Sequence, residues 1–285
     1  MNPTIKILET PRDAMQGLHR IVPTDKKVEL INSLLQVGFD IIDIGSIVSE
    51  KAVPQMKDTP EVLDRIITEG SLSKVFVLTV NAIGAEKVAV HPKVSYVGFP
   101  FSPSPTFLKK NINSDFDKAW KTINEIQNSC IKWKKNFLVY FSMAFGNPYG
   151  DPENVEIIYE WTEKLFQIGI RNISLSDITG VADPKKIESI FYCLTNQYPE
   201  IEFGLHLHTK GDDTVHKLNA AFNNGCQLFE GVINGLGGCP MTGYELLGNL
   251  PTGSIIDWAS SKKLNLNINY KKYLIALNTA NKILY

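Results

Sequence analysis

Eight short apolar runs rich in β-forming residues alternate with longer segments of helical periodicity along the whole 285-residue chain. No proline- or serine-rich linker and no low-complexity tract interrupts them, so the alternation indicates one domain built of βα units. The predicted strands span 4–9, 40–45, 74–80, 94–99, 136–142, 171–176, 202–208 and 227–233. The predicted helices span 25–37, 59–69, 114–132, 153–168, 184–196 and 213–224, with a weaker candidate at 82–91.

Alternating βα units fit either a closed barrel or a doubly wound open sheet, and polar residues distinguish the two. Nearly every predicted strand ends at a residue suited to chemistry: Glu9, Asp13, Asp43, Asn81, Asp177, His206, His208, Asn234 and Cys239. In a closed barrel the carboxyl ends of the strands converge on one mouth, whereas in an open sheet they lie along an edge. We therefore predict a single (β/α)8 TIM barrel over residues 1–285, with its active site at the C-terminal mouth of the strands.

Composition excludes several classes of partner. The 29 basic and 30 acidic residues give a net charge of -1, so no overall field attracts nucleic acid or an anionic membrane. No apolar run approaches the roughly 18 to 20 residues needed to cross a bilayer. The four cysteines lie far apart and no signal-peptide pattern is present, which predicts a reduced, cytoplasmic protein.

A pair of histidines, His206 and His208, lies in the predicted strand 202–208. Side chains alternate along a strand, so both imidazoles face the same way, as ligands of one metal ion would. The alternative to metal binding is that both are ordinary strand histidines whose rings bond to the backbone. After the first strand, Asp13 offers an oxygen ligand and Arg12 a fixed cation for an oxyanion. The same residues are also typical of a turn with a solvated charge pair.

The stretch 231–240 reads Gly-Val-Ile-Asn-Gly-Leu-Gly-Gly-Cys-Pro and continues to Gly248-Asn249-Leu250. Cysteine is usually buried in cores, but the glycines around Cys239 predict a flexible loop that carries its thiol. We predict that 233–250 forms a mobile, cysteine-bearing active-site loop. The other three cysteines, Cys130, Cys193 and Cys226, fit the core.

Six motifs follow one another along the chain: Pro11-Arg12-Asp13, Ser46-x-Val48-Ser49 with Val53-Pro54-Gln55-Met56, Lys109-Lys110-Asn111-Ile112-Asn113, Ser174-Leu175-x-Asp177, His206-x-His208 and Gly235-Leu236-Gly237-Gly238-Cys239-Pro240. In order and spacing, from about residue 4 to 252, they resemble hydroxymethylglutaryl-CoA lyase, a (β/α)8 barrel of the metallolyase superfamily. The metal-site motifs point to the superfamily, and the loop with Cys239 points to the lyase branch.

The resemblance implies an activity of leucine degradation, the retro-Claisen cleavage of 3-hydroxy-3-methylglutaryl-CoA to acetyl-CoA and acetoacetate. It implies a divalent cation, Mg²⁺ or Mn²⁺ with Zn²⁺ or Co²⁺ as alternatives, on Asp13, His206, His208 and Asn249. Arg12 would stabilise the enolate, and Cys239 would return a proton to it from a loop that closes over the site. The family commonly forms dimers, so a homodimer is expected.

The general base stays open among Asp177, Asp43 and Glu9, each of which can also be a strand-end hydrogen-bond acceptor. Gln16, Asn81 and Glu9 are predicted to bind substrate. Lys109 and Lys110, which follow the fourth strand, are candidates for the phosphates of CoA, with a solvated lysine pair as the alternative.

Some positions depart from the pattern of better-known lyases. Asp43 stands where they carry glutamate, and the loop from Cys239 to Asn249 is one residue longer. A displacement of about 1 Å in a catalytic group can cost roughly a hundredfold in rate, which leaves a related 3-hydroxyacyl-CoA open as substrate. Two other functions also stay open. One is a 2-oxoacid aldolase or acyl-CoA condensing enzyme, similar to isopropylmalate or citramalate synthase, and the other is a non-catalytic metal- or acyl-CoA-binding barrel.

Overall fold

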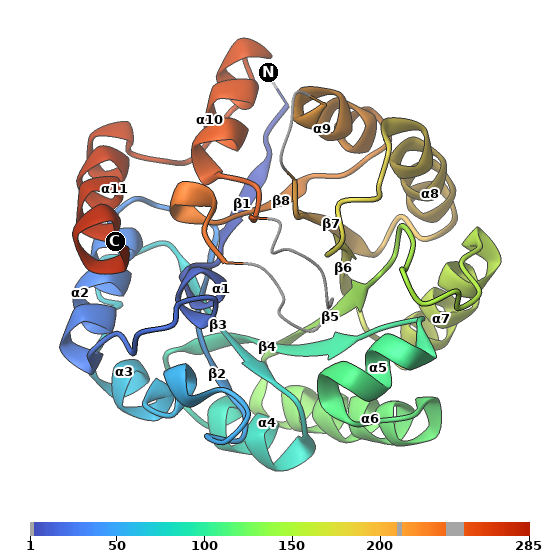
Figure 1. Ribbon diagram of the computed structural model, residues 1–285, viewed down its shortest axis with the longest axis horizontal. Coiled ribbons are helices and arrows are strands. Elements are labelled where there is room, and N and C mark those ends of the chain that lie inside the picture. The colour runs from blue at the N-terminus through green and yellow to red at the C-terminus, as the bar shows by residue number, and fades with distance from the viewer. Residues whose placement is uncertain (1–2, 210–212, 238–247) are drawn as a thin grey trace.

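A closed barrel of eight parallel strands forms the centre of the computed structural model, which describes residues 3–209, 213–237 and 248–285. The strands are β1 (Lys6–Glu9), β2 (Ile41–Ile47), β3 (Lys74–Thr79), β4 (Val94–Phe101), β5 (Asn136–Ser142), β6 (Asn172–Asp177), β7 (Glu202–Leu207) and β8 (Leu228–Gly231). They pair in chain order, and β8 pairs with β1 (Figure 1). The predicted (β/α)8 barrel is confirmed.

Helices enclose the ring of strands. They are α1 (Pro11–Gln16), α2 (Thr24–Leu35), α3 (Thr59–Arg65), α4 (Ala82–Ala89), α5 (Pro105–Ile112), α6 (Phe116–Trp133), α7 (Val155–Gln167), α8 (Pro184–Gln197), α9 (Thr214–Asn223), α10 (Thr252–Ser261) and α11 (Tyr270–Leu284), with 3₁₀ turns η1 (Pro54–Met56) and η2 (Ile233–Gly235). All the predicted helices are present. Among the described residues, none of the helices combines the length and the apolar character that crossing a membrane requires.

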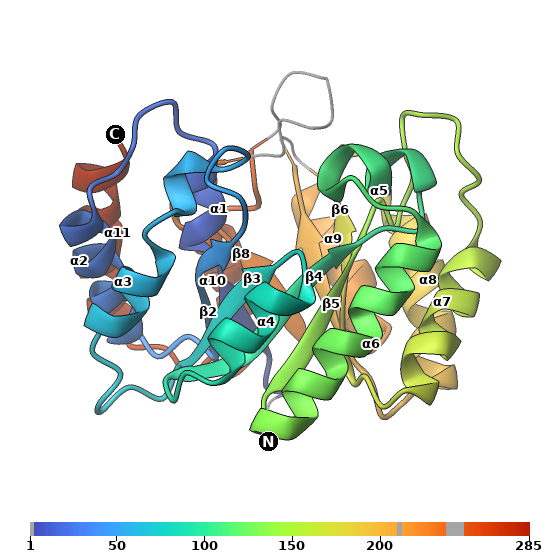
Figure 2. The ribbon, with the colours of Figure 1, turned by 90° about the horizontal axis from the view of Figure 1, so that it is seen from below.

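Four helices were not predicted: α10 and α11 near the end of the chain, and two short helices at the rim, α1 and α5 (Figure 2). Pro11 opens α1, since a proline at the first helical position loses no hydrogen bond. The hydroxyl of Ser104 caps α5 by accepting from the backbone N–H of Phe107 at 3.1 Å. Lys109 and Lys110 therefore lie in the last turn of a helix.

The inside of the barrel is filled with side chains. Inward-facing residues form an apolar plug of Leu8, Ile41, Phe76, Leu78, Leu138, Tyr140 and Leu228. A Cβ at Gly98 would lie 2.1 Å from Cζ of Phe76, so a glycine in β4 leaves the space that this ring occupies. Nearer the carboxyl ends, inward positions are polar, which places chemical groups on a solid apolar base.

Glu9 lies on the outer side of β1, because the preceding Leu8 faces the interior. Its carboxylate accepts hydrogen bonds from the backbone N–H of Ile233 at 2.6 Å and from the Thr252 hydroxyl at 2.5 Å. These contacts join the end of β1 to η2 and to α10. Complete burial raises the pKa of Glu9 to about 8, although both hydrogen bonds act in the opposite direction.

Glu9→Gln should stabilise the protein at alkaline pH. The pKa of Glu9 is about 8 in the folded protein against an ordinary value of 4.5. The folded state therefore keeps a proton that the unfolded chain releases, and this stabilising contribution is lost as the pH rises through that interval. Glutamine stays neutral and its amide can donate to the Thr252 hydroxyl, so we expect a free energy of unfolding about 1–3 kcal/mol above wild type at pH 9. Urea titrations at pH 9 and pH 4.5 measure the difference, which should vanish at the lower pH; a variant less stable at pH 9 contradicts the assignment.

Candidate active site

Three side chains with metal-ligand chemistry meet at the barrel mouth: Asp13 from α1, His206 from β7 and His208 just beyond it. Their ligand atoms all lie within 4.8 Å of one another, and all three residues are buried. Nε2 of His206 lies 3.1 Å from Nε2 of His208 and 3.9 Å from Oδ2 of Asp13. If two nitrogens each lie about 2.1 Å from one ion and the nitrogen–ion–nitrogen angle is about 90°, the nitrogens are about 3 Å apart. The two imidazoles therefore have the spacing of adjacent ligands of one ion.

Asn249 lies beside this group because residues 248–250 run along the end of β7. It forms an antiparallel bridge with His208, and the backbone N–H of Leu250 donates to the carbonyl of Leu207 at 2.9 Å. Its side-chain Nδ2 donates to the carbonyl of Leu236 at 2.8 Å, while its buried Oδ1 has no hydrogen-bond partner among the described residues. Burying an amide oxygen without a hydrogen-bond partner costs free energy, and a bound cation would supply the missing partner. Two imidazoles and two oxygens therefore fit a divalent metal ion.

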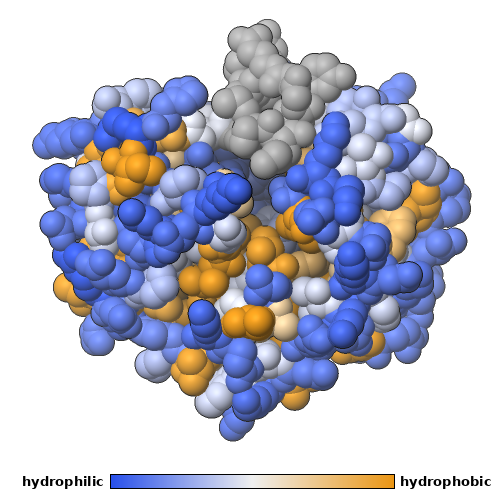
Figure 3. Space-filling model, turned by 60° about the horizontal axis from the view of Figure 1, so that its bottom comes forward, coloured by the Kyte–Doolittle hydropathy of each residue, from blue (hydrophilic) through white to orange (hydrophobic). Residues whose placement is uncertain are grey.

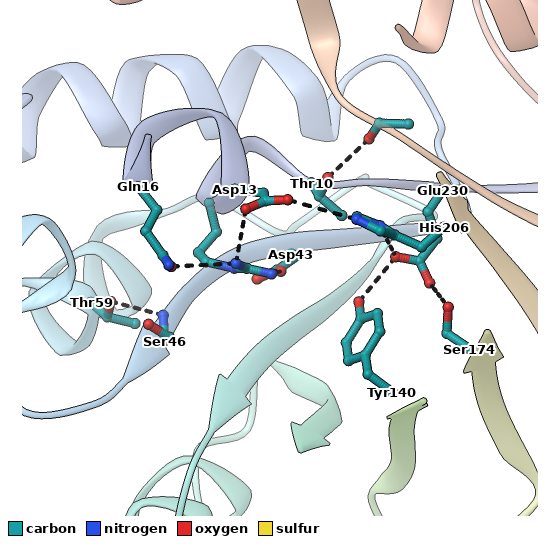
Figure 4. A network of polar contacts seen from close by, with 12 residues as sticks. Thr10, Asp13, Gln16, Asp43, Ser46, Thr59, Tyr140, Ser174, His206 and Glu230 are labelled. Atoms are coloured by element: carbon teal, nitrogen blue, oxygen red, sulfur yellow. Dashed lines mark hydrogen bonds and ion pairs between the residues drawn. The ribbon is translucent and has the colours of Figure 1, made fainter. Parts of the chain in front are cut away.

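Arg12 and Asp43 form a buried ion pair next to Asp13. Figure 4 shows Asp43 near Asp13 and Gln16. Nε and Nη2 of Arg12 lie 2.8 and 2.7 Å from Oδ2 of Asp43, and Nη1 lies 3.4 Å from both Oδ1 of Asp13 and Oε1 of Gln16. Burial would lower the pKa of Arg12, but the two carboxylates outweigh it and raise that pKa, so the guanidinium stays charged. The shorter side chain of Asp43 thus still reaches the arginine.

One carboxylate oxygen of Asp43 is left without a hydrogen bond. Its Oδ1 is buried and has no hydrogen-bond partner among the described residues. Burial raises the pKa of Asp43 to about 6, against the lowering effect of Arg12. A carboxylate with these properties can accept a proton near neutral pH.

A cavity of about 770 Å³ opens above these residues. Its polar lining includes Arg12, Asp13, Gln16, Lys110, Tyr140, His206 and His208, and its apolar lining includes Val48, Val53, Leu78, Ile112 and Ile178. Hydrophobic residues gather at the centre of the face shown in Figure 3, within a mostly hydrophilic surround. A site of this size with an apolar wall and a few converging polar groups suits a small organic ligand with a reactive polar end.

Known proteins share this arrangement of fold and motifs. The HMGL-like family model matches residues 4–279. The chain belongs to the HMGL-like family. A mouse protein named cytoplasmic 3-hydroxy-3-methylglutaryl-CoA lyase is 31% identical over 273 residues, which are 95% of this chain and 79% of the mouse protein.

Solved structures of HMG-CoA lyases superpose closely on this HMGL-like chain. The Bacillus subtilis enzyme gives a TM-score of 0.92 at 28% identity, covering 99% of this chain and 95% of that one. The Acinetobacter baumannii enzyme, solved in complex with coenzyme A and 3-methylmalate, gives 0.91 at 27% identity, covering 99% and 91%. The resemblance inferred from the motifs is confirmed at the level of the family.

Two of the three candidate bases lie on the outer side of their strands in this HMGL-like protein. Asp177 follows the cavity-lining Ser176, so its carboxylate lies on the outer side of β6. There it accepts from the backbone N–H groups of Ala182 at 2.8 Å, Val181 at 3.1 Å and Thr179 at 3.3 Å. Burial raises its pKa, and these donors oppose that rise. Glu9 likewise faces away from the cavity, so neither a base role nor substrate binding fits it. Asp43 is completely buried and is not a lining residue either, but it points inward and binds Arg12, which lines the cavity, so it is left as the candidate base.

Some of the predicted substrate-binding residues line the cavity and others do not. Gln16 and Lys110 line the cavity, with the Lys110 ammonium 4.3 Å from the centre of the Tyr149 ring. Within the described part of the chain, Asn81 and Lys109 are not among the cavity-lining residues. The Asn81 side chain instead caps α4, accepting from the backbone N–H of Gly84 at 2.8 Å. Cys239, the predicted proton donor, lies outside the described residues.

Several site residues were missed from the sequence. Ser46 and Ser176 line the cavity with buried hydroxyls that have no partner among the described residues, which suits polar atoms of a ligand. Tyr140 and Glu230 lie in the barrel interior next to His206. Alternation along each strand could have placed them, since Ser176 pairs with His206 and Glu230 is its partner on β8.

The glycine-rich segment packs directly against α1. A Cβ at Gly237 would lie 2.5 Å from the carbonyl oxygen of Asp13 and 2.8 Å from Nδ2 of Asn249, and φ of Gly237 is +92°. A Cβ at Gly17 would in turn lie 2.8 Å from Cα of Gly237. Glycine at these positions therefore permits the close approach that brings Asn249 next to Asp13.

Gly237→Ala should displace Asp13 and Asn249 and weaken binding of a divalent cation. We expect the dissociation constant for Mn²⁺, measured by electron paramagnetic resonance, to rise at least about tenfold. Gly70→Ala is the matched control, because φ of Gly70 is +78° but nothing lies within 4 Å of the added Cβ. It should cost a similar backbone strain of about 1 kcal/mol and leave Mn²⁺ affinity unchanged. Equal affinities in Gly237→Ala and wild type would disprove the packing argument.

Proposed function

We propose that this protein is a metal-dependent carbon–carbon lyase that cleaves 3-hydroxy-3-methylglutaryl-CoA to acetyl-CoA and acetoacetate. The observation that carries the proposal is the juxtaposition of the Asp13–His206–His208 group with Arg12 at one cavity, where Asp43 binds Arg12 from the buried side. Membership of the HMGL-like family and the likeness to solved HMG-CoA lyases support it. The mouse relative is named cytoplasmic, and we extend that compartment and a homodimeric state to this chain as expectations.

The ligands Asp13, His206, His208 and Asn249 would hold the cation. Mg²⁺ or Mn²⁺ suits the oxygen ligands, and Zn²⁺ or Co²⁺ is compatible with the imidazoles. When bound, such a cation lowers the pKa of the substrate's 3-hydroxyl and polarises its oxygens.

Asp43 takes the proton of the 3-hydroxyl, because its Oδ1 is unpartnered among the described residues while Arg12 fixes the other oxygen. The carbon that bears this hydroxyl becomes the ketone of acetoacetate as the C2–C3 bond breaks. The bonding electrons pass to the thioester enolate of acetyl-CoA, where the N–H groups of Arg12 stabilise the negative oxygen. Cys239 returns a proton to the enolate carbon.

The rest of the cavity binds the two ends of the thioester. Gln16, Ser46 and Ser176 would contact the polar atoms of the acyl group. Lys110, at the end of α5, would contact a phosphate of CoA; the A. baumannii relative was solved with coenzyme A bound. The apolar wall excludes water from the enolate.

Metal-reconstituted protein incubated with hydroxymethylglutaryl-CoA should release acetoacetate and acetyl-CoA in equal amounts. Arg12→Met removes the donors to the enolate, so we expect kcat to fall by about 10² to 10³ with a smaller change in KM. Coupled assays for both products measure this. Absence of cleavage by the wild type with each of the four cations, or thiol release from acetyl-CoA and a 2-oxoacid in its place, contradicts the proposed reaction.

Cys239→Ala should lower the cleavage rate at least about tenfold while circular dichroism shows an unchanged fold, because the enolate would lose its proton donor. Cys193→Ala serves as control, since Cys193 is a half-buried residue of α8 away from the cavity lining, and its rate should match wild type. A wild-type rate in Cys239→Ala rules out the proton-donor role.

A further inference from the structure

Glu230 is a fully enclosed carboxylate inside the barrel, and the proposed chemistry does not use it. It lies on β8 directly beside His206 in the strand ladder and is 1% exposed. Its Oε2 lies 3.1 Å from Nδ1 of His206 and 3.1 Å from the hydroxyl of Tyr140, and its Oε1 accepts from the hydroxyl of Ser174 (Figure 4). Three side chains from three different strands therefore converge on one carboxylate.

The contact with His206 determines which ring nitrogen carries a proton. Oε2 of Glu230 is an acceptor for the Tyr140 hydroxyl and faces Nδ1 of His206, so Nδ1 is the nitrogen that donates in this contact. In the neutral imidazole Nε2 then carries the lone pair. Nε2 is the atom that lies 3.1 Å from Nε2 of His208 and 3.9 Å from Oδ2 of Asp13. The lone pair of His206 thus faces the other predicted ligands.

We propose that Glu230 is a positioning residue that fixes the tautomer and the ring orientation of His206 for metal binding. The inference rests on the proposed metal site. A carboxylate on the far side of a ligating imidazole raises the basicity of that ligand and removes its freedom to rotate. Glu230 therefore contributes to metal affinity without touching metal or substrate.

The surroundings keep this carboxylate in place. Tyr140 donates to Oε2 and also packs edge-on against the His206 ring, with centroids 6.2 Å apart and planes at 81°. Ser174 stands opposite Gly204 in the β6–β7 ladder, and a Cβ at Gly204 would lie 3.4 Å from the Ser174 hydroxyl and 3.2 Å from Leu228. The glycine thus leaves room for the serine and Leu228. Groups held on strands are well suited to orienting a ligand, because the barrel backbone restricts their movement.

Two substitutions at Glu230 test the role. Glu230→Met removes the acceptor at similar side-chain length, so we expect Mn²⁺ affinity to fall about 10- to 100-fold. In the metal-free protein, ¹⁵N NMR of the His206 ring should show loss of the Nδ1–H tautomer. Glu230→Gln can still accept from Nδ1–H through its carbonyl and donate to Ser174 through its amide. It should retain the tautomer and bind Mn²⁺ within about threefold of wild type, which a merely space-filling role does not predict.

Glu202→Met is the matched control, because Glu202 lies on the same strand as His206 but at its opposite end, paired with Lys6 at 2.5 Å. It should change neither the Mn²⁺ affinity nor the tautomer. If Glu230→Met does not fold, Ser174→Ala decides, since it keeps the carboxylate but removes one of its anchors; we expect about three- to tenfold weaker Mn²⁺ binding.

Unchanged affinity and an unchanged tautomer in Glu230→Met, or in Ser174→Ala where it must substitute, overturn the positioning role. A wild type that binds no divalent cation overturns the proposed metal site instead. The two failures are distinguishable because the tautomer is read in the metal-free protein.

Discussion

Closure of the barrel by β1 and β8 is the contact on which the site depends. The two strands pair from Lys6 with Leu228 to Glu9 with Gly231, and this places the start of the chain beside residues more than 200 positions later. Asp13 can meet His206, His208 and Asn249 only because that seam is closed. The outward carboxylate of Glu9 ties the seam to η2 and α10, so the same strand that brings Asp13 to the mouth also anchors the segment that brings Asn249.

The site concentrates charge in a region without bulk water. Asp13 and Asp43 share a single guanidinium, that of Arg12, and Glu230 contacts His206, above an apolar plug. Electrostatic interactions in such surroundings are much stronger than at a protein surface, and an uncompensated buried charge is correspondingly costly. Two carboxylates, those of Asp13 and Asp43, share the one guanidinium of Arg12, and a divalent metal ion beside Asp13 would add positive charge to this group. The electrostatics and the ligand geometry therefore agree on the kind of ion that the mouth would hold.

Periodicity and motif order were enough to predict the barrel, the orientation of His206 and His208 and their meeting with Asp13, because these depend only on strand alternation and on ring closure. It was harder to predict whether the side chain at the last residue of a strand faces the inside or the outside of the barrel. Asp177 and Glu9 lie at strand ends like true site residues but point outward, and Asn81 caps a helix instead of reaching the cavity. Glu230 and Tyr140 were missed because their place beside His206 depends on the register between strands as well as on alternation within each strand. The helices α1 and α5 were missed because six and eight residues are too few to show a periodicity.

The attachment of residues 248–250 to the end of β7 has an evolutionary consequence. Backbone pairing with His208 fixes the position of Asn249. The carboxylate of Glu9 accepts hydrogen bonds from Ile233 and Thr252 on either side of this segment. Insertions or deletions between these anchors need not shift the asparagine. Changes in length between residues 237 and 248 are therefore compatible with an unchanged position of Asn249 beside Asp13, His206 and His208.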